Sequence, residues 1–140
     1  MTNRNMAEIV KRQNPATLPV TATVLEACRI MRDRRIGAIL VTGADGRLAG
    51  LVTGRDIVGR VAAEARDPAT TELGAVMTAR PDTVGPKAHA IDALRMMRDG
   101  GYRHVPILDG TTIVGIVSHG DFEGLERARL DTETGLWEVL

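Results

Sequence analysis

The sequence contains very few of the residues on which several functional classes depend. Its 140 residues include one cysteine, Cys28, and one each of tryptophan, tyrosine and phenylalanine. A single cysteine excludes an internal disulfide bond and fits a reducing cytoplasmic compartment. So few aromatic side chains argue against a surface that stacks several nucleic-acid bases. The formal net charge is zero, from 18 basic and 18 acidic residues, so the chain has no overall attraction to nucleic acid or anionic lipid.

Long apolar runs are missing as well. The first residues, MTNRNMAEIVKRQ, contain no apolar core of a secretory signal, and no run reaches the length of a membrane-spanning helix. We therefore expect a cytoplasmic protein without a membrane or nucleic-acid partner. The composition is 44% hydrophobic and 26% charged, which is typical of a globular domain. Cys28 lies in an apolar helical pattern and is interpreted as a small buried side chain.

The strongest pattern is an internal duplication. GLVTGRD at residues 50–56 returns as GIVSHGD at residues 115–121, and residues 17–43 align with residues 83–109. The alignment slips by one residue between TGADGR and LDGT, which are turn sequences where a change in length costs little. A register that is kept elsewhere indicates a true duplication. The expected divisions are a first motif at 7–63, a linker at 64–72, a second motif at 73–128 and a tail at 129–140.

Both copies predict the same order of elements. A short extended piece follows an Xaa-Pro step, and an apolar stripe at helical spacing comes next, capped in the first copy by Thr23. Two apolar runs then flank an Asp-Gly pair, at residues 45–46 and at 109–110, which predicts a hairpin. A second helix follows. Because a motif of about 50 residues buries too little surface to be stable alone, we expect an α+β fold of two pseudo-symmetric β-α-β-β-α halves packed through their sheets.

Thr53 and Asp56, repeated as Ser118 and Asp121, allow two interpretations. The hydroxyl can cap the N-terminus of the second helix while the carboxylate caps in return. The same geometry also suits a nucleotide. A helix N-terminus attracts phosphate, the hydroxyl can donate to it, and the carboxylate can accept hydrogen bonds from both ribose hydroxyls.

Two further features bear on the same choice. Gly50 and Gly115 would let another backbone or a ligand ring approach the strand closely. In YRHVP at 102–106, Arg103 offers a fork of donors for phosphate, and His104 can donate near neutral pH. In the alternative interpretation the two residues bind nothing: Arg103 is a charge on the surface and His104 is a half-buried spacer. The residues alone leave both interpretations open.

The ordered set of motifs resembles a tandem pair of cystathionine beta-synthase (CBS) domains, known as a Bateman module. The second copy carries PDTV, YRHVPILD and GIVSHGD, and the first carries PATL, IGAILV and GLVTGRD. The resemblance covers almost the whole chain. It implies two motifs packed through their sheets, a homodimer, and an adenosyl ligand such as AMP, ADP, ATP, NAD or S-adenosylmethionine. Mg²⁺ would be an optional companion of ATP, and no other cofactor is required.

Carried onto this sequence, the resemblance implies two nucleotide sites. In the second site Thr83 and Val84 would surround the base, whereas Ser118 would reach the phosphate and Asp121 the ribose. In the first site Arg55 would replace the missing Arg-His pair as a phosphate contact, because Gly-Ala-Ile-Leu stands at 37–40 in place of Arg-His-Val-Pro. The second site comprises Thr83, Val84, Tyr102, Arg103, His104, Val105, Pro106, Ser118 and Asp121. The first site comprises Thr17, Leu18, Gly37, Ala38, Ile39, Thr53, Arg55 and Asp56.

We therefore expect a regulatory or sensor module that acts in trans on an effector protein through a ligand-dependent change in a dimer. The alternative is a ligand-free scaffold that dimerises and docks a partner, which the capping interpretation fits. An enzyme is not expected, since the histidines and the cysteine show no metal-ligand spacing and no nucleophile or phosphate-loop motif is present. Asp56 and Asp121 occupy matching positions of two copies, which indicates two separate sites instead of one paired-carboxylate centre.

Overall fold

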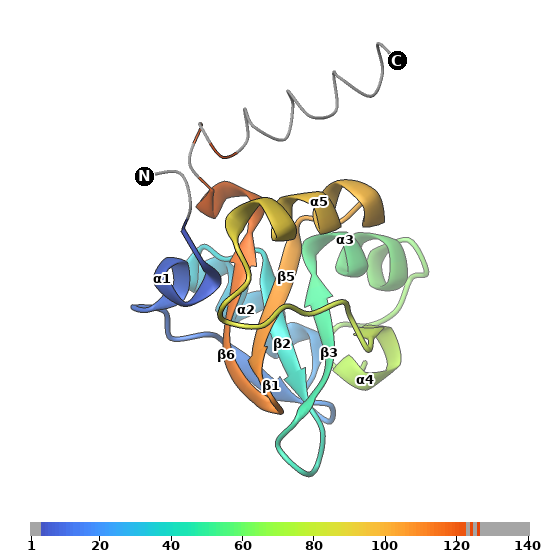
Figure 1. Cartoon of the computed structure of the whole chain (residues 1–140). Helices are drawn as coiled ribbons and strands as arrows, with labels where there is room; N and C mark the ends of the chain where they lie inside the picture. The colour runs from blue at the N-terminus through green and yellow to red at the C-terminus, as the bar shows by residue number, and fades with distance from the viewer. Residues whose placement is uncertain (1–3, 123, 125, 127–140) are drawn as a thin grey trace. The chain divides into compact units, whose positions relative to one another are not determined.

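The computed structural model of the chain describes residues 4–122, 124 and 126. The chain divides into two compact units, which we call the first unit (Asn14–Pro81) and the second unit (Met1–Gln13 with Asp82–Leu140). Both contain helices and strands, so the fold is α+β (Figure 1). No helix in the described ranges combines the length and apolar character that a bilayer span requires. The tail predicted at 129–140, with Trp137, lies outside the described residues.

The first unit is built on a four-stranded sheet. The strands lie in the order β1-β2-β3-β4, with β1 parallel to β2 and the other neighbours antiparallel. The predicted order of elements is confirmed, and α3 continues into a π-helical turn. In chain order the elements are β1 (Thr17–Pro19), α2 (Val24–Arg34), β2 (Ala38–Thr42), β3 (Leu48–Thr53), α3 (Gly54–Ile57), the π-helical turn (Val58–Ala62), α4 (Leu73–Val76) and β4 (Thr78–Ala79).

The second unit repeats the helix and the antiparallel hairpin of this plan, here α5 with β5 and β6, and a 3-10 turn follows β6. Val84 makes an isolated parallel bridge with Ile107, at the place where the first unit has β1. Thr42 pairs with Leu48, whereas its counterpart Leu108 pairs with Ile113, so the extra residue of the first copy lies inside the hairpin turn as predicted. The elements of this unit are α1 (Met6–Val10), α5 (Ala90–Gly100), β5 (His104–Asp109), β6 (Thr112–Ser118) and a 3-10 turn (His119–Asp121).

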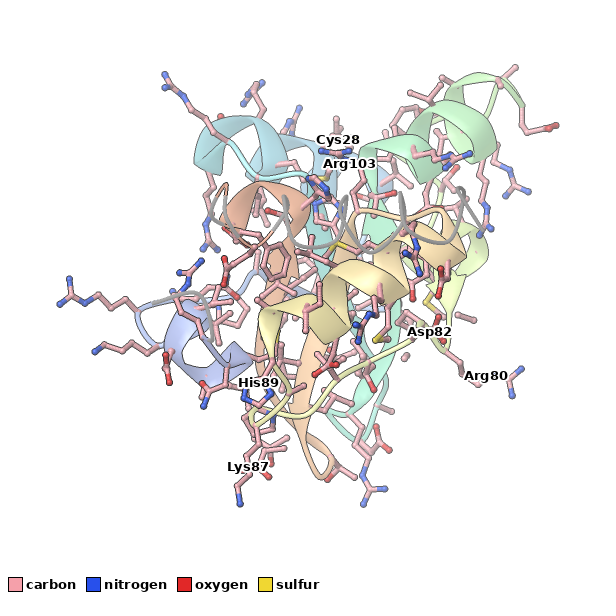
Figure 2. The ribbon with its side chains drawn as sticks, turned by 45° about the horizontal axis from the view of Figure 1, so that its top comes forward. Cys28, Arg80, Asp82, Lys87, His89 and Arg103 are labelled. Carbon is pink, nitrogen blue, oxygen red and sulfur yellow. The ribbon has the colours of Figure 1, made fainter. Side chains whose placement is uncertain are left out.

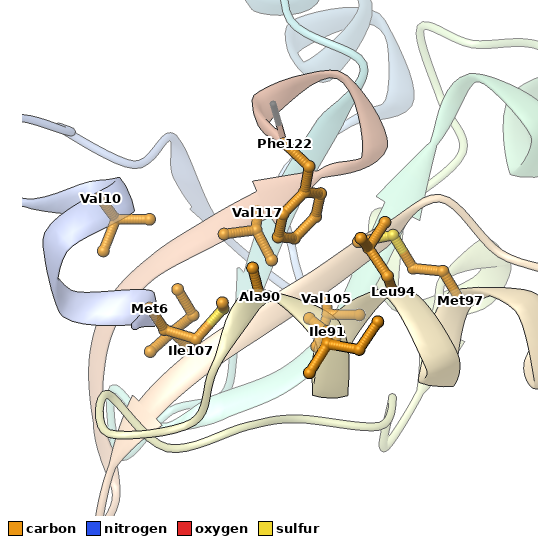
Figure 3. Close-up of a cluster of buried hydrophobic side chains, with 11 residues drawn as sticks. Met6, Val10, Ala90, Ile91, Leu94, Met97, Val105, Ile107, Val117 and Phe122 are labelled. Atoms are coloured by element: carbon orange, nitrogen blue, oxygen red, sulfur yellow. The ribbon is translucent and has the colours of Figure 1, made fainter. Parts of the chain in front are cut away.

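Each unit has its own apolar core. In the second unit the apolar stripe of α5 packs on β5 and β6, and Phe122 closes the end of the core (Figure 3). In the first unit α2 packs on β2 and β3, with Val24 and Ala27 fully buried. Cys28 is half-buried against this core, and burial raises the pKa of its thiol. The interpretation of Cys28 as a small apolar side chain is therefore supported.

A short segment at the start of each predicted motif completes the unit of the other motif. α1 lies at the start of the first motif but packs against β6, and Met6 is fully buried there. α4 and β4 open the second predicted motif but belong to the first unit, where Leu73 is fully buried. The two segments make matching contacts, because Met6 N donates to Ala88 O at 2.8 Å and Leu73 N donates to Ala22 O at 2.8 Å. The compact units therefore differ from the predicted motif ranges, since each segment finds its apolar partner surface on the other copy.

Gly50 and Gly115 lie where these segments cross the strands. A Cβ added at Gly50 would lie 2.8 Å from the backbone oxygen of Thr78 and 2.5 Å from Sδ of Met77. One added at Gly115 would lie 2.7 Å from Oε1 of Gln13. The close approach predicted at these glycines is therefore made by segments of the chain itself.

We expect Gly50→Ala to lower the free energy of unfolding by about 1–3 kcal/mol, because the Thr78 backbone cannot move aside as a flexible side chain would. Gly54→Ala is the matched control, since the space around a Cβ at Gly54 is open to 4 Å. Urea unfolding of both variants measures the difference. Equal losses of stability would contradict the crossing as the reason for the glycine.

The helices α2 and α5 both end on a left-handed residue. Arg35 has φ 54° at the end of α2, and its counterpart Gly101 has φ 72° at the end of α5. The glycine stop predicted for the second copy is thus confirmed, while the first copy forms the same cap with a side chain present. An L-residue in this conformation costs roughly 1–2 kcal/mol, a cost that glycine avoids.

Arg35→Gly should therefore raise the free energy of unfolding by about 1 kcal/mol, and Gly101→Ala should lower it by a similar amount. The thermal unfolding midpoint of each variant, compared with wild type, tests this pair. A fall in the midpoint of Arg35→Gly would show that the guanidinium contributes more than the left-handed backbone costs.

Candidate functional site

In the second unit, the predicted site residues gather where β5 begins and β6 ends. His104 is the first residue of β5 and Ser118 the last of β6, and the two are register partners. The carbonyl of Arg103 accepts a hydrogen bond from His119 N at 2.9 Å, which holds the turn after β6 beside the start of β5. Asp121 ends that 3-10 turn. The phosphate and ribose residues of the predicted second site are therefore neighbours.

The predicted base-binding segment lies beside the same strand. Val84 N donates to Pro106 O at 3.1 Å, and Leu108 N donates to Val84 O at 2.9 Å. These bonds place Thr83, which is exposed, next to the first half of β5. Val105 is fully buried in the core, so its side chain packs there and only its backbone could contact a ligand.

Asp121 caps its turn with one carboxylate oxygen. Its Oδ2 accepts from the backbone N of Ser118 at 2.7 Å and from Ser118 Oγ at 3.2 Å. Among the described residues, Oδ1 of Asp121 has no hydrogen-bond partner, and the residue is exposed. The capping interpretation therefore accounts for one oxygen and leaves the other able to accept from a ligand.

Asp56, the counterpart in the first unit, engages both oxygens. Its Oδ2 accepts from Thr53 N at 2.9 Å and from Thr53 Oγ1 at 3.2 Å. Its Oδ1 accepts from Thr78 Oγ1 at 3.1 Å and lies 3.9 Å from Nε of Arg60. The residue is only 9% exposed. Both oxygens of this carboxylate therefore already have partners within the first unit.

The remaining residues of the first predicted site occupy positions that match the second. Thr17 and Leu18 lie in β1, and Gly37 accepts from Gly54 N at 3.3 Å, as Arg103 does from His119. Ile39 is fully buried, so its side chain belongs to the core. Ala38 is buried, Arg55 is exposed, and Thr53 caps α3. The structure thus brings this set together but without a charged pair at the start of β2.

The hydrogen-bond donors of the second site suit an anion. Burial lowers the pKa of His104 below its ordinary value of 6.5, the Arg103 charge lowers it further, and Asp121 opposes them. His104 is therefore neutral at pH 7 and offers one ring nitrogen as a donor. The Arg103 side chain is exposed (Figure 2). A guanidinium, an imidazole and the Ser118 hydroxyl at one strand end suit phosphate oxygens.

Tyr102 is tied to a residue that the sequence analysis missed. Its hydroxyl donates to Oδ2 of Asp82 at 2.7 Å, and burial together with this bond raises the pKa of Tyr102 to about 12. The hydroxyl therefore stays protonated and holds the residue before Thr83. The aligned positions in the first copy are Ala16 and Ile36, which cannot form such a bond. No local pattern around Asp82 predicts its partner.

Pro106 changes how the edge segment pairs. Its counterpart Leu40 donates its backbone N–H to Ala16 O at 3.0 Å, and β1 pairs with β2 along its whole length. Proline has no N–H, so the carbonyl of Asp82 cannot be paired in this way. The bridge at Val84 is what pairs this segment with β5. The two copies therefore differ at the segment predicted to surround the base.

A metal centre is not seen in the part of the chain that the structure describes. Within those residues, no group of three or more His, Cys, Asp or Glu side chains is arranged to hold an ion. The chemistry on hand is hydrogen bonding and charge: a carboxylate oxygen, a hydroxyl, a guanidinium and an imidazole. This set can bind a sugar phosphate.

Comparisons with known proteins agree with the duplicated fold. The profile of the CBS domain matches residues 6–63 and 73–123. The CBS domain-containing protein YhcV of Bacillus subtilis is 36% identical over 106 residues, which are 76% of this chain and 74% of that protein. The Arabidopsis thaliana protein CBSCBSPB3 is 37% identical over 101 residues, which are 72% of this chain. The chain spans only 18% to 22% of the length of this protein and of the four other Arabidopsis CBSCBSPB proteins that it matches.

A solved structure is similar over nearly the whole chain. It is a CBS domain protein from Pyrobaculum aerophilum complexed with AMP, with a TM-score of 0.82 and 29% identity, and the match covers 92% of this chain and 99% of that one. The profile match falls on both duplicated copies, and each copy has a helix followed by a two-stranded hairpin in the predicted order. The chain therefore belongs to the CBS domain family and carries two CBS domains in tandem.

Proposed function

We propose that this CBS pair is a regulatory module that binds one adenosyl nucleotide in its second unit. The AMP complex of a protein with the same fold supports the ligand class. The observation that carries the proposal is the difference between Asp121 and Asp56. Within the described residues Asp121 has one oxygen without a partner, whereas both oxygens of Asp56 are occupied.

The proposed roles follow from the chemistry of each group. Oδ1 of Asp121 accepts from the ribose hydroxyls, because an ionised carboxylate is acceptor-only and forms strong bonds with such donors. Thr83 and the half-buried Val84 form the wall for the base. Arg103 and His104 bind the phosphate, and the Ser118 hydroxyl adds a donor.

The flanking residues shape the site. The bond from the Tyr102 hydroxyl to Asp82 sets the position of the base segment. Because of Pro106, that segment pairs with β5 only at the Val84 bridge, whereas β1 in the first unit pairs with β2 along its whole length. We propose that this incomplete pairing makes the second unit a ligand site, whereas the matching residues of the first unit are structural. The two copies then share a fold but not a function.

The wider role is regulation without catalysis. In this proposal a homodimer of the chain changes on binding AMP, ADP, ATP, NAD or S-adenosylmethionine and acts in trans on an effector protein. A second candidate is the ligand-free scaffold. The observation in its favour is that Thr53 with Asp56, and Ser118 with Asp121, both form capping boxes, which need no ligand.

Isothermal titration calorimetry with these five ligands tests the proposal. We expect one equivalent to bind per chain. Asp121→Asn should weaken binding by roughly 10- to 100-fold, because a charge-assisted hydrogen bond contributes about 1.5–3 kcal/mol. The amide oxygen can still cap Ser118, so the fold is kept. Asp56→Asn is the matched control and should leave the affinity within about twofold.

The outcomes separate the candidates. Absence of heat and of a thermal shift with all five ligands would favour the scaffold. Equal losses of affinity in the two aspartate variants, with two equivalents bound to wild type, would show that both copies bind. Light scattering of the free and ligand-bound chain measures the dimer.

Protonation of His104 gives an independent test. In the free protein its NMR titration midpoint should lie below 6.5, chiefly because the ring is buried. The unfolded chain then binds the proton first as pH falls, so this group's contribution to stability is complete above 6.5 and is lost below it. His104→Gln should remove that part of the pH dependence. A phosphate ligand favours the charged ring, so the midpoint should rise on binding, and an unchanged midpoint would place the phosphate elsewhere.

A further inference from the structure

An ion pair with a buried carboxylate joins Arg4 of the N-terminal segment to Glu126. Nη2 of Arg4 lies 2.7 Å from Oε1 of Glu126, and Nε of Arg4 donates to Oε2 at 3.4 Å. The Glu126 side chain is 1% exposed and that of Arg4 25%. A carboxylate this deeply buried needs its counter-charge, because removing one partner leaves an uncompensated charge in a medium of low dielectric constant.

The same guanidinium also reaches the nucleotide site. Nη2 of Arg4 donates to the backbone oxygen of Asp121 at 3.2 Å, and Arg4 O accepts from Ala90 N at 3.0 Å. On the other side of Asp121, Phe122 is 2% exposed within the core. The 3-10 turn that carries Asp121 is therefore held by an apolar anchor at Phe122 and by a charged anchor at Arg4.

The Arg4–Glu126 pair, which we call the polar clamp, has no counterpart in the first unit. By the alignment of the copies, Val61 stands where the second unit has Glu126, and it is 1% exposed in the apolar core. Thr71 stands in place of Arg4, because Thr71 O accepts from Val24 N as Arg4 O accepts from the first residue of α5. The polar clamp therefore occurs in the unit whose aspartate keeps an oxygen open.

We propose that Arg4 is a positioning residue of the nucleotide site. It fixes the backbone of Asp121 so that Oδ2 caps Ser118 and Oδ1 stays open for the ribose. The inference rests on the proposed function of the second unit. Arg4 touches no ligand and acts through Asp121, so docking of the N-terminal segment and nucleotide binding favour each other to the same extent.

A test must separate positioning from stability. Arg4→Met alone removes a charged partner of the buried Glu126 and should destabilise the fold. The double variant Arg4→Met/Glu126→Leu replaces the pair by apolar side chains, as at Val61, with no change in net charge. Arg98→Met is the control for loss of an arginine, because Arg98 forms an exposed pair with Asp99 at 2.9 Å.

Two readouts on the full chain decide the proposal. The first is amide hydrogen exchange at Ser118, whose N–H donates to Asp121, relative to Leu108, whose N–H donates to Val84. In the double variant we expect protection to fall about tenfold more at Ser118 than at Leu108, which removes any global loss of stability from the comparison. The second is calorimetry with AMP, where we expect about a tenfold loss of affinity. Arg98→Met should change neither readout.

Each outcome bears on one claim. If Ser118 loses no more protection than Leu108, or if the double variant binds AMP as tightly as wild type, the positioning role is overturned. If wild type binds none of the adenosyl ligands, the proposed function fails. The exchange at Ser118 then still decides whether Arg4 holds Asp121 in place.

Discussion

The structure depends on one hydrogen-bonded turn that occurs twice. At the end of β3 and again at the end of β6, a hydroxyl and the amide of the same residue bond one oxygen of an aspartate three residues on. This cap satisfies donors that would otherwise be unpaired at the start of the following turn. It also fixes the carboxylate. The two copies then differ in whether the second carboxylate oxygen has a hydrogen-bond partner.

The short segments that each unit receives from the other motif set the surroundings of that second oxygen. β4 precedes the extended piece of the second copy but completes the first unit, and its Thr78 takes the second oxygen of Asp56. The N-terminal segment completes the second unit, and its Arg4 bonds the backbone of Asp121 and not its carboxylate. Duplicated copies with the same cap thus differ in the second carboxylate oxygen, which has a partner in Asp56 and none among the described residues in Asp121.

Local patterns in the sequence predicted most of the fold, whereas the resemblance to a CBS pair supplied most members of the candidate site, which stay predictions. The hairpins, the helix ends and the capping boxes follow from residues within a few positions of one another, which is where propensity and turn chemistry act. The contacts that distinguish the two copies are not local. Tyr102 bonds Asp82 across 20 residues, Thr78 bonds Asp56 across 22, and Arg4 bonds Glu126 across 122. No spacing rule covers such separations, so these pairs required the structure.

The asymmetry also bears on how a small ligand could act at a distance. If Asp121 binds the ribose, the ligand contacts a turn that Arg4 and Phe122 already restrain. Anything that loosens the N-terminal segment then loosens the turn, and by linkage a bound nucleotide tightens the segment. The proposed coupling uses three successive contacts within one unit. Asp121 caps Ser118, Arg4 bonds the backbone oxygen of Asp121, and Arg4 pairs with the buried Glu126. A signal of this kind needs no change in the angle between the two units, which distinguishes it from the hinge-like response that a pair of similar halves would otherwise favour.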